Sequence, residues 1–120
     1  MKKILIIDDA ATVRMYHRNI LTEAGYHVEE AINGLEGLEK VLQQSFDLFL
    51  VDVNMPKLDG YGFLRELRQL DVPQSPAIVI STEATESDRQ RAYVAGANMY
   101  MVKPIQPDQL LAPIALLLGI

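Results

Sequence analysis

The chain of 120 residues contains no cysteine. This absence excludes disulfides and thiolate chemistry, so any metal ligand must be an oxygen atom or a histidine. Long apolar runs are also missing at the start, where Met1-Lys2-Lys3 leads into only four apolar residues. A segment this short matches neither a signal peptide nor a membrane span. We therefore expect a cytoplasmic protein.

Positive charge is scarce, because 11 Lys and Arg stand against 16 Asp and Glu and the formal net charge is -5. The arginines cluster only at Arg65/Arg68 and Arg89/Arg91, which is no basic patch for nucleic acid. The apolar stretch 110–118 is too short to cross a bilayer and lacks the basic face of an interfacial helix. We expect no contact with nucleic acid or membrane, and we expect this stretch to pack on the domain or on a partner.

Size and composition predict one domain over residues 1–120, since 49% of the residues are hydrophobic and no segment has low complexity. Short apolar runs alternate five times with segments of helical period, a pattern typical of βα units around a parallel sheet. Strands are expected over 3–7, 27–31, 47–52, 77–81 and 99–102. Helices are expected over 12–24, 34–44, 60–70 and 86–95, with a fifth from Pro107.

This order predicts an α/β fold: a doubly wound, five-stranded parallel sheet of order 2-1-3-4-5, flanked by five helices in a flavodoxin-like arrangement. The apolar period predicts that the second helix buries Leu35, Leu38, Val41 and Leu42. In the fifth helix Pro113 removes a backbone hydrogen bond, which predicts a kink or a short helix.

Acidic residues end two of the predicted strands: Asp8-Asp9 follow the first apolar run, and Asp52 ends the third. Carboxyl ends of neighbouring parallel strands border one crevice, so we expect these carboxylates within a few ångströms of one another. Such a cluster repels itself and calls for a cation, and oxygen ligands favour Mg²⁺. The backbone carbonyl of Asn54, in the turn after Asp52, is placed to add a further oxygen.

Two more side chains are expected at the same rim, Lys103 at the end of the fifth strand and Ser81 at the end of the fourth. A divalent ion, an ammonium, a hydroxyl and a carboxylate nucleophile are the groups that phosphoryl transfer needs, because its barrier yields mainly to positioning and charge stabilisation. Asp52 is the candidate nucleophile, and its product would be an acyl phosphate.

These motifs give the chain a clear resemblance to a known family. It resembles the receiver domain of bacterial two-component response regulators, and most of all the single-domain chemotaxis type. The matching residues are Asp8-Asp9, Asp52 with Asn54-Met55-Pro56, Asp59-Gly60, Ser81, Tyr100 and Lys103-Pro104.

The resemblance implies that a sensor histidine kinase or phosphotransfer protein donates a phosphoryl group to Asp52, and that Lys103 contacts the phosphoryl oxygens. It implies a switch in which Ser81 moves toward the phosphoryl group and Tyr100 turns inward, remodelling a face of fourth helix, fifth strand and fifth helix for an output protein. It also implies a cis Lys103-Pro104 bond. The protein would catalyse only its own phosphorylation and dephosphorylation. A phosphorylation-dependent dimer through the apolar fifth helix is a further expectation.

Single residues also argue against two other classes of protein. A flavodoxin-like electron carrier would need a loop that attracts phosphate, where Asp8-Asp9 would repel it. A phosphatase of the haloacid dehalogenase class would need a second aspartate where Asn54 stands. A receiver domain cut from a longer regulator stays open. His17 and His27 are expected to be ordinary surface or half-buried residues.

Overall fold

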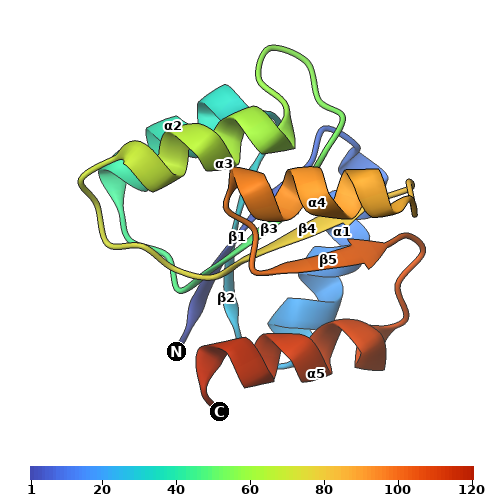
Figure 1. Ribbon diagram of the computed structural model, residues 1–120. Helices are drawn as coiled ribbons and strands as arrows, with labels where there is room; N and C mark the ends of the chain where they lie inside the picture. The colour runs from blue at the N-terminus through green and yellow to red at the C-terminus, as the bar shows by residue number, and fades with distance from the viewer.

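Strands and helices alternate along the chain in the computed structural model, which describes all residues 1–120 (Figure 1). The strands are β1 (Lys3–Ile7), β2 (His27–Ala31), β3 (Leu48–Asp52), β4 (Ala77–Ser81) and β5 (Met99–Val102). The helices are α1 (Ala11–Glu23), α2 (Gly34–Gln43), α3 (Gly60–Gln69), α4 (Glu86–Ala95) and α5 (Pro107–Leu118). The predicted boundaries therefore hold to within one residue.

All neighbouring strands pair in parallel, in the order β2-β1-β3-β4-β5. This confirms the predicted doubly wound fold. The register sets Ile7 beside Val51 and Asp52 beside Ile80, so β1 and β3 end at the same edge of the sheet. Residues that follow these two strands in the sequence consequently meet there.

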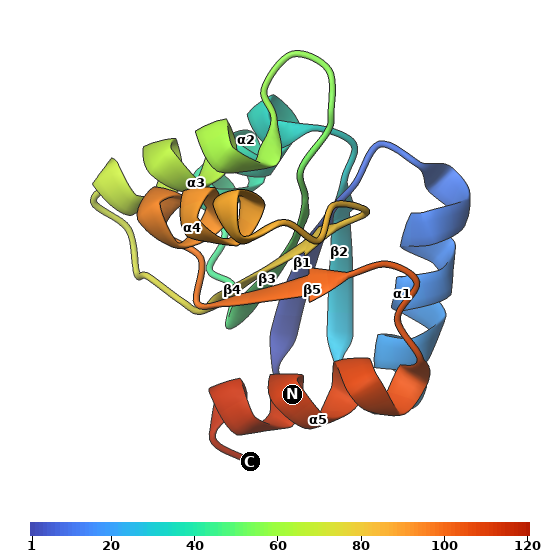
Figure 2. The same cartoon turned by 45° about the vertical axis from the view of Figure 1, so that its right-hand side comes forward.

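Each face of the sheet has its own apolar core. Leu5 and Ile7 of β1 pack with residues of α2, α3 and α4, whereas Ile4 and Ile6 pack with residues of α1 and α5. The alternation arises because successive side chains of a strand point to opposite faces. Figure 2 shows α1 and α5 on one side of the sheet and the other three helices on the opposite side.

The inner face of α2 differs from the prediction. Leu35 is 46% exposed and Leu42 is 67% exposed, so placing these two side chains in the core was wrong. The buried positions of α2 are Gly34, Gly37 and Val41. A Cβ at Gly37 would lie 2.8 Å from the Ile7 side chain, which shows that the helix backbone itself approaches the sheet closely. The glycines form a contact surface that an apolar pattern does not reveal.

The last helix, α5, begins with Pro107 and is held by a capping box between Gln106 and Gln109. The helix continues through Pro113 to Leu118, so it does not end early at the proline. Leu110 and Ile114 are its buried residues. No helix of the protein combines the length and the apolar character that a membrane crossing requires.

Candidate functional site

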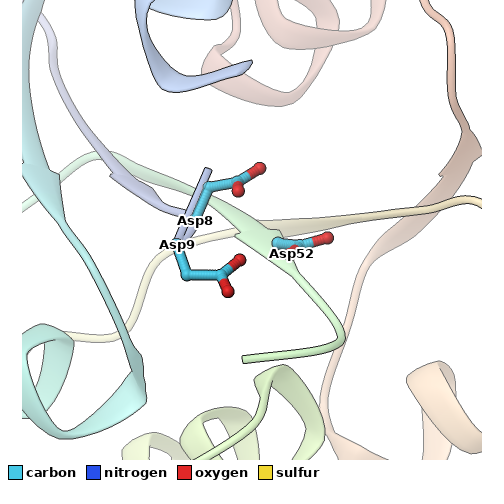
Figure 3. A group of neighbouring side chains, drawn as sticks. All are labelled: Asp8, Asp9 and Asp52. Carbon is cyan, nitrogen blue, oxygen red and sulfur yellow. The ribbon is translucent and has the colours of Figure 1, made fainter. Parts of the chain in front are cut away.

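Three carboxylates meet at the edge where β1 and β3 end. Oxygen atoms of Asp8, Asp9 and Asp52 all lie within 4.8 Å of one another (Figure 3). Asp8 is buried, Asp9 is exposed and Asp52 is intermediate. The predicted meeting of two acidic strand ends is therefore what the structure shows.

Asp8 is fixed in place by the backbone around it. Its carboxylate accepts a hydrogen bond from the Ala10 N–H at 2.9 Å, and its own N–H donates to the Ala31 carbonyl at 3.0 Å. Arg14 of α1 donates from its guanidinium to the Asp8 carbonyl at 2.7 Å. These contacts hold a carboxylate that is only 3% exposed against the end of the sheet.

Lys103 brings a positive charge to the acidic cluster. Its backbone N–H donates to the carbonyl of Ser81 at 2.8 Å, which continues the pairing of β5 with β4. Its ammonium lies 2.9 Å from Asp52 Oδ1 and 3.4 Å from Asp8 Oδ2. The Lys103-Pro104 peptide bond is cis, as expected from the resemblance. The expected position of the Lys103 ammonium, at the same rim as Asp8 and Asp52, is therefore confirmed.

Burial and charge act in opposite directions on the pKa values of this pair. Burial raises the pKa of Asp52, and the charge of Asp8 raises it further, although the Lys103 ammonium opposes both effects. Burial by itself would lower the pKa of Lys103, but its hydrogen bond to Asp52 and the two negative charges outweigh burial and raise that pKa. Lys103 is therefore held in its charged form, while the carboxylates repel one another.

The donor set suits a hard divalent cation. Mg²⁺ takes oxygen ligands and is usually bound through one or two carboxylates together with waters and phosphate. The three clustered carboxylates supply such oxygens. The carbonyl of Asn54, in the turn after β3, accepts no backbone hydrogen bond and so stays available as an additional oxygen. The residues present therefore fit Mg²⁺.

The turn that follows Asp52 is closed by a glycine. The Gly60 N–H donates to the Val53 carbonyl at 2.9 Å, and a Cβ at Gly60 would lie only 2.2 Å from the carbonyl oxygen of Asp52. Asp59 caps α3 by accepting a hydrogen bond from the Gly62 N–H at 2.8 Å. Asp52 consequently lies at the base of a turn that only glycine permits.

Ser81 and Tyr100 are joined through the peptide groups of one residue, Glu83. The Glu83 N–H donates to Ser81 Oγ at 3.0 Å, and the Tyr100 hydroxyl donates to the Glu83 carbonyl at 2.7 Å. Tyr100 is 5% exposed, so the ring already has, in this structure, the inward orientation that the resemblance assigns to the switch. Sequence reasoning selected both side chains but not this link, because a backbone connection has no sequence signature.

His17 is buried, with 3% of its surface exposed, which corrects the expectation of a surface or half-buried residue. Its ring meets that of Tyr16 edge to face at 5.4 Å, and it lines a hollow of about 220 Å³ together with Lys103. The pKa of His17 is lowered, chiefly by burial. Its spacing of four residues from Val13 and from Leu21 was the signal for the inner face of α1.

The comparisons with known proteins agree with this fold and site. A family model described as the response regulator receiver domain matches residues 4–115. The chemotaxis protein CheY of Bacillus subtilis is 41% identical over 113 residues, which cover 93% of each chain. CheY of Thermotoga maritima is 38% identical over 109 residues, or 90% of each chain.

The fold and acidic site define a phosphoacceptor signalling domain. The chain belongs to the response regulator receiver domain family.

A solved structure gives the same result in three dimensions. The receiver domain of a sensor histidine kinase from Pseudomonas aeruginosa superposes with a TM-score of 0.91 at 28% identity, covering 99% of this chain and 98% of that one. That protein has a magnesium ion coordinated in its active-site cleft.

Proposed function

We propose that Asp52 is the phosphoacceptor of this receiver domain and that a phosphohistidine of a sensor histidine kinase or phosphotransfer protein is the donor. The observation that carries the proposal is the position of the Lys103 ammonium, 2.9 Å from Asp52 Oδ1 within the group of three carboxylates. A cation beside a nucleophilic carboxylate is suited to stabilise the charge of a transferring phosphoryl group.

In the proposed reaction a carboxylate oxygen of Asp52 attacks the phosphorus atom, and the phosphorus–nitrogen bond of the phosphohistidine breaks. The electron pair of that bond stays on the imidazole nitrogen, which takes a proton from solvent. Lys103 then turns its ammonium from the carboxylate to the phosphoryl oxygens. The same site hydrolyses the acyl phosphate, so the protein acts only on its own phosphorylation state.

Asp8, Asp9 and Asp52 would hold Mg²⁺, with the carbonyl of Asn54 as a further ligand. When bound, the ion supplies positive charge that offsets the carboxylates and the phosphoryl oxygens. The role of the chain is to keep Asp8 rigid through Ala10 and Arg14, so that the acidic oxygens stay converged. A rigid site avoids reorganisation during transfer.

Phosphorylation would change the face formed by α4, β5 and α5. The added charge attracts the hydroxyl of Ser81, which in the resting protein accepts from the Glu83 N–H. Because the Glu83 carbonyl also holds Tyr100, movement of Ser81 changes the support of that ring. The face formed by α4, β5 and α5 is the proposed docking surface for an output protein.

The proposed domain covers residues 1–120, and the match to CheY over 93% of both chains supports a receiver of this size. An electron carrier is not favoured, because Asp8 and Asp9 would repel a flavin phosphate. A cytoplasmic location stays a prediction.

Intact-mass spectrometry tests the proposal. The parent protein and Asp52→Asn are incubated with acetyl phosphate, with and without Mg²⁺. We expect the mass of one phosphoryl group to be gained only by the parent and only with Mg²⁺. Equal labelling of both proteins would overturn the assignment of Asp52, and equal labelling with a chelator present would overturn the role of Mg²⁺.

A further inference from the structure

The ring of Tyr100 is held from two sides by different elements. Its hydroxyl donates to the carbonyl of Glu83 at 2.7 Å, in the loop between β4 and α4. On the other side, the guanidinium carbon of Arg89 lies over the ring, 5.1 Å from its centroid. A cation in this position over an aromatic face is attracted by the electrons of the ring.

Arg89 has no competing ionic partner. None of the ion pairs in the protein includes this residue, so the Tyr100 ring is the identified contact of its charge. Arg91, two positions later on α4, stacks in the same way over Tyr61 of α3 at 4.6 Å. The helix therefore carries two arginine–tyrosine contacts, but only one of them involves a residue connected to the acidic site.

We propose that Arg89 is a positioning residue for Tyr100, which keeps the ring turned inward in the unphosphorylated protein and so biases the α4, β5 and α5 face toward the arrangement that phosphorylation is proposed to produce. This inference rests on the proposed function of that face. To turn outward, Tyr100 must leave both the carbonyl of Glu83 and the guanidinium of Arg89. The second contact thus adds to the first and favours the inward ring before any phosphorylation.

The contribution of Arg89 is modest in size. A cation over an aromatic ring near the surface shifts an equilibrium by about two- to fivefold. Removing the charge should therefore increase the fraction of outward Tyr100 by this factor without unfolding the domain.

Nitration of tyrosines by tetranitromethane measures ring accessibility at each position, with nitrated peptides counted by mass spectrometry. The variant Arg89→Met removes the charge and keeps most of the side-chain length. Arg91→Met is the matched control on the same helix. Tyr93, which is 44% exposed, serves as an internal reference for reagent activity. Arg89→Lys tests whether a cation restores the effect.

We expect the Tyr100 nitration rate to rise about two- to fivefold in Arg89→Met, to stay at the parent value in Arg91→Met and to fall back toward it in Arg89→Lys. An unchanged Tyr100 rate in Arg89→Met would overturn the proposal. So would an equal rise in both methionine variants, which would mean general loosening of α4. The assay needs no phosphodonor, so its result is independent of whether Asp52 is phosphorylated.

Discussion

At the scale of single residues, Asp52, the proposed phosphoacceptor, has an electrostatically unfavourable environment for its negative charge. Burial and the charge of Asp8 raise its pKa above the ordinary value of 3.8. The folded protein therefore binds a proton at Asp52 more readily than the unfolded chain does, and stability falls as the pH rises from 3.8 through the folded pKa. A neutral residue of the same shape escapes this loss.

The variant Asp52→Asn should accordingly have a higher free energy of unfolding than the parent at pH 7 in the absence of Mg²⁺. The difference should shrink as the pH falls from the folded pKa of Asp52 and be smallest below 3.8, where the parent carboxyl is protonated in both states. Urea unfolding at pH 4 and pH 7 measures this. A variant that is less stable than the parent at pH 7 contradicts the electrostatic account.

Magnesium provides the complementary measurement on the same two proteins. A ligand that binds only the folded state at 100 times its Kd adds about 2.7 kcal/mol of stability. We expect Mg²⁺ to stabilise the parent clearly and Asp52→Asn much less, because one of the three clustered carboxylates is then lost. If Mg²⁺ stabilised both proteins equally, the ion would bind at a site that does not include Asp52.

His17 gives a pH dependence of the opposite sign. Burial lowers its pKa below 6.5, so in the window below pH 6.5 the unfolded chain binds the proton more readily. Stability contributed by neutral His17 is complete above pH 6.5 and is lost as the pH falls through the folded pKa. Replacing His17 with Gln should flatten this slope in urea unfolding, whereas His27→Gln, at an exposed position, should keep it.

At the scale of helices and strands, the boundaries were predictable because local chemistry sets them. Gly25 and Gly96 adopt positive φ angles of 97° and 121° at helix ends, and the caps of Asp59 and Thr85 accept hydrogen bonds from the first turns that follow them. Each signal acts within a few residues of sequence. The register of the sheet then follows from the order of the βα units.

Features that depend on contacts between elements were less predictable. The carboxylates and Lys103 were found because parallel strand ends must meet at one edge. By contrast, the stack of Arg89 on Tyr100 depends on how α4 is rotated against β5, and the charged surface of α4 gives little apolar pattern to fix that rotation. The exposure of Leu35 was missed because the close approach of α2 is made by glycine.

The turn between β3 and α3 should tolerate no side chain at Gly60. Gly60→Ala places a Cβ 2.2 Å from the carbonyl of Asp52, and overpacking of this kind costs about 1–3 kcal/mol or more. Gly119→Ala, at φ 76° with no atom within 4 Å, should cost only the left-handed strain of about 1–2 kcal/mol. Only Gly60→Ala should also slow labelling by acetyl phosphate. Normal labelling there would show that the turn does not position Asp52.

At the scale of the whole molecule, the acidic site lies at one edge of the sheet, and the end of the chain, in and after α5, carries exposed apolar side chains. Leu116 of α5 is 75% exposed and Ile120 is 70% exposed. A contiguous apolar patch of this kind would mark an interaction surface. The docking face proposed for output proteins thus includes a helix that is partly apolar toward solvent.

Self-association through α5 follows as a prediction. We expect phosphorylated protein to sediment in part as a dimer, and we expect Leu116→Asp to remain monomeric while its Asp52 is labelled normally. Analytical ultracentrifugation with acetyl phosphate and Mg²⁺ makes the comparison. The prediction is contradicted if the fully phosphorylated parent protein stays monomeric at concentrations up to those of the labelling reaction.

The chemical identity of the modified atom tests the central claim most directly. Sodium borohydride reduces an aspartyl phosphate to homoserine, so the phosphorylated protein can be reduced, digested and sequenced by mass spectrometry. Our account predicts homoserine at position 52 and at no other aspartate. Homoserine at Asp8 or Asp9, or phosphate retained on a hydroxyl or imidazole side chain while position 52 stays unmodified, would contradict it.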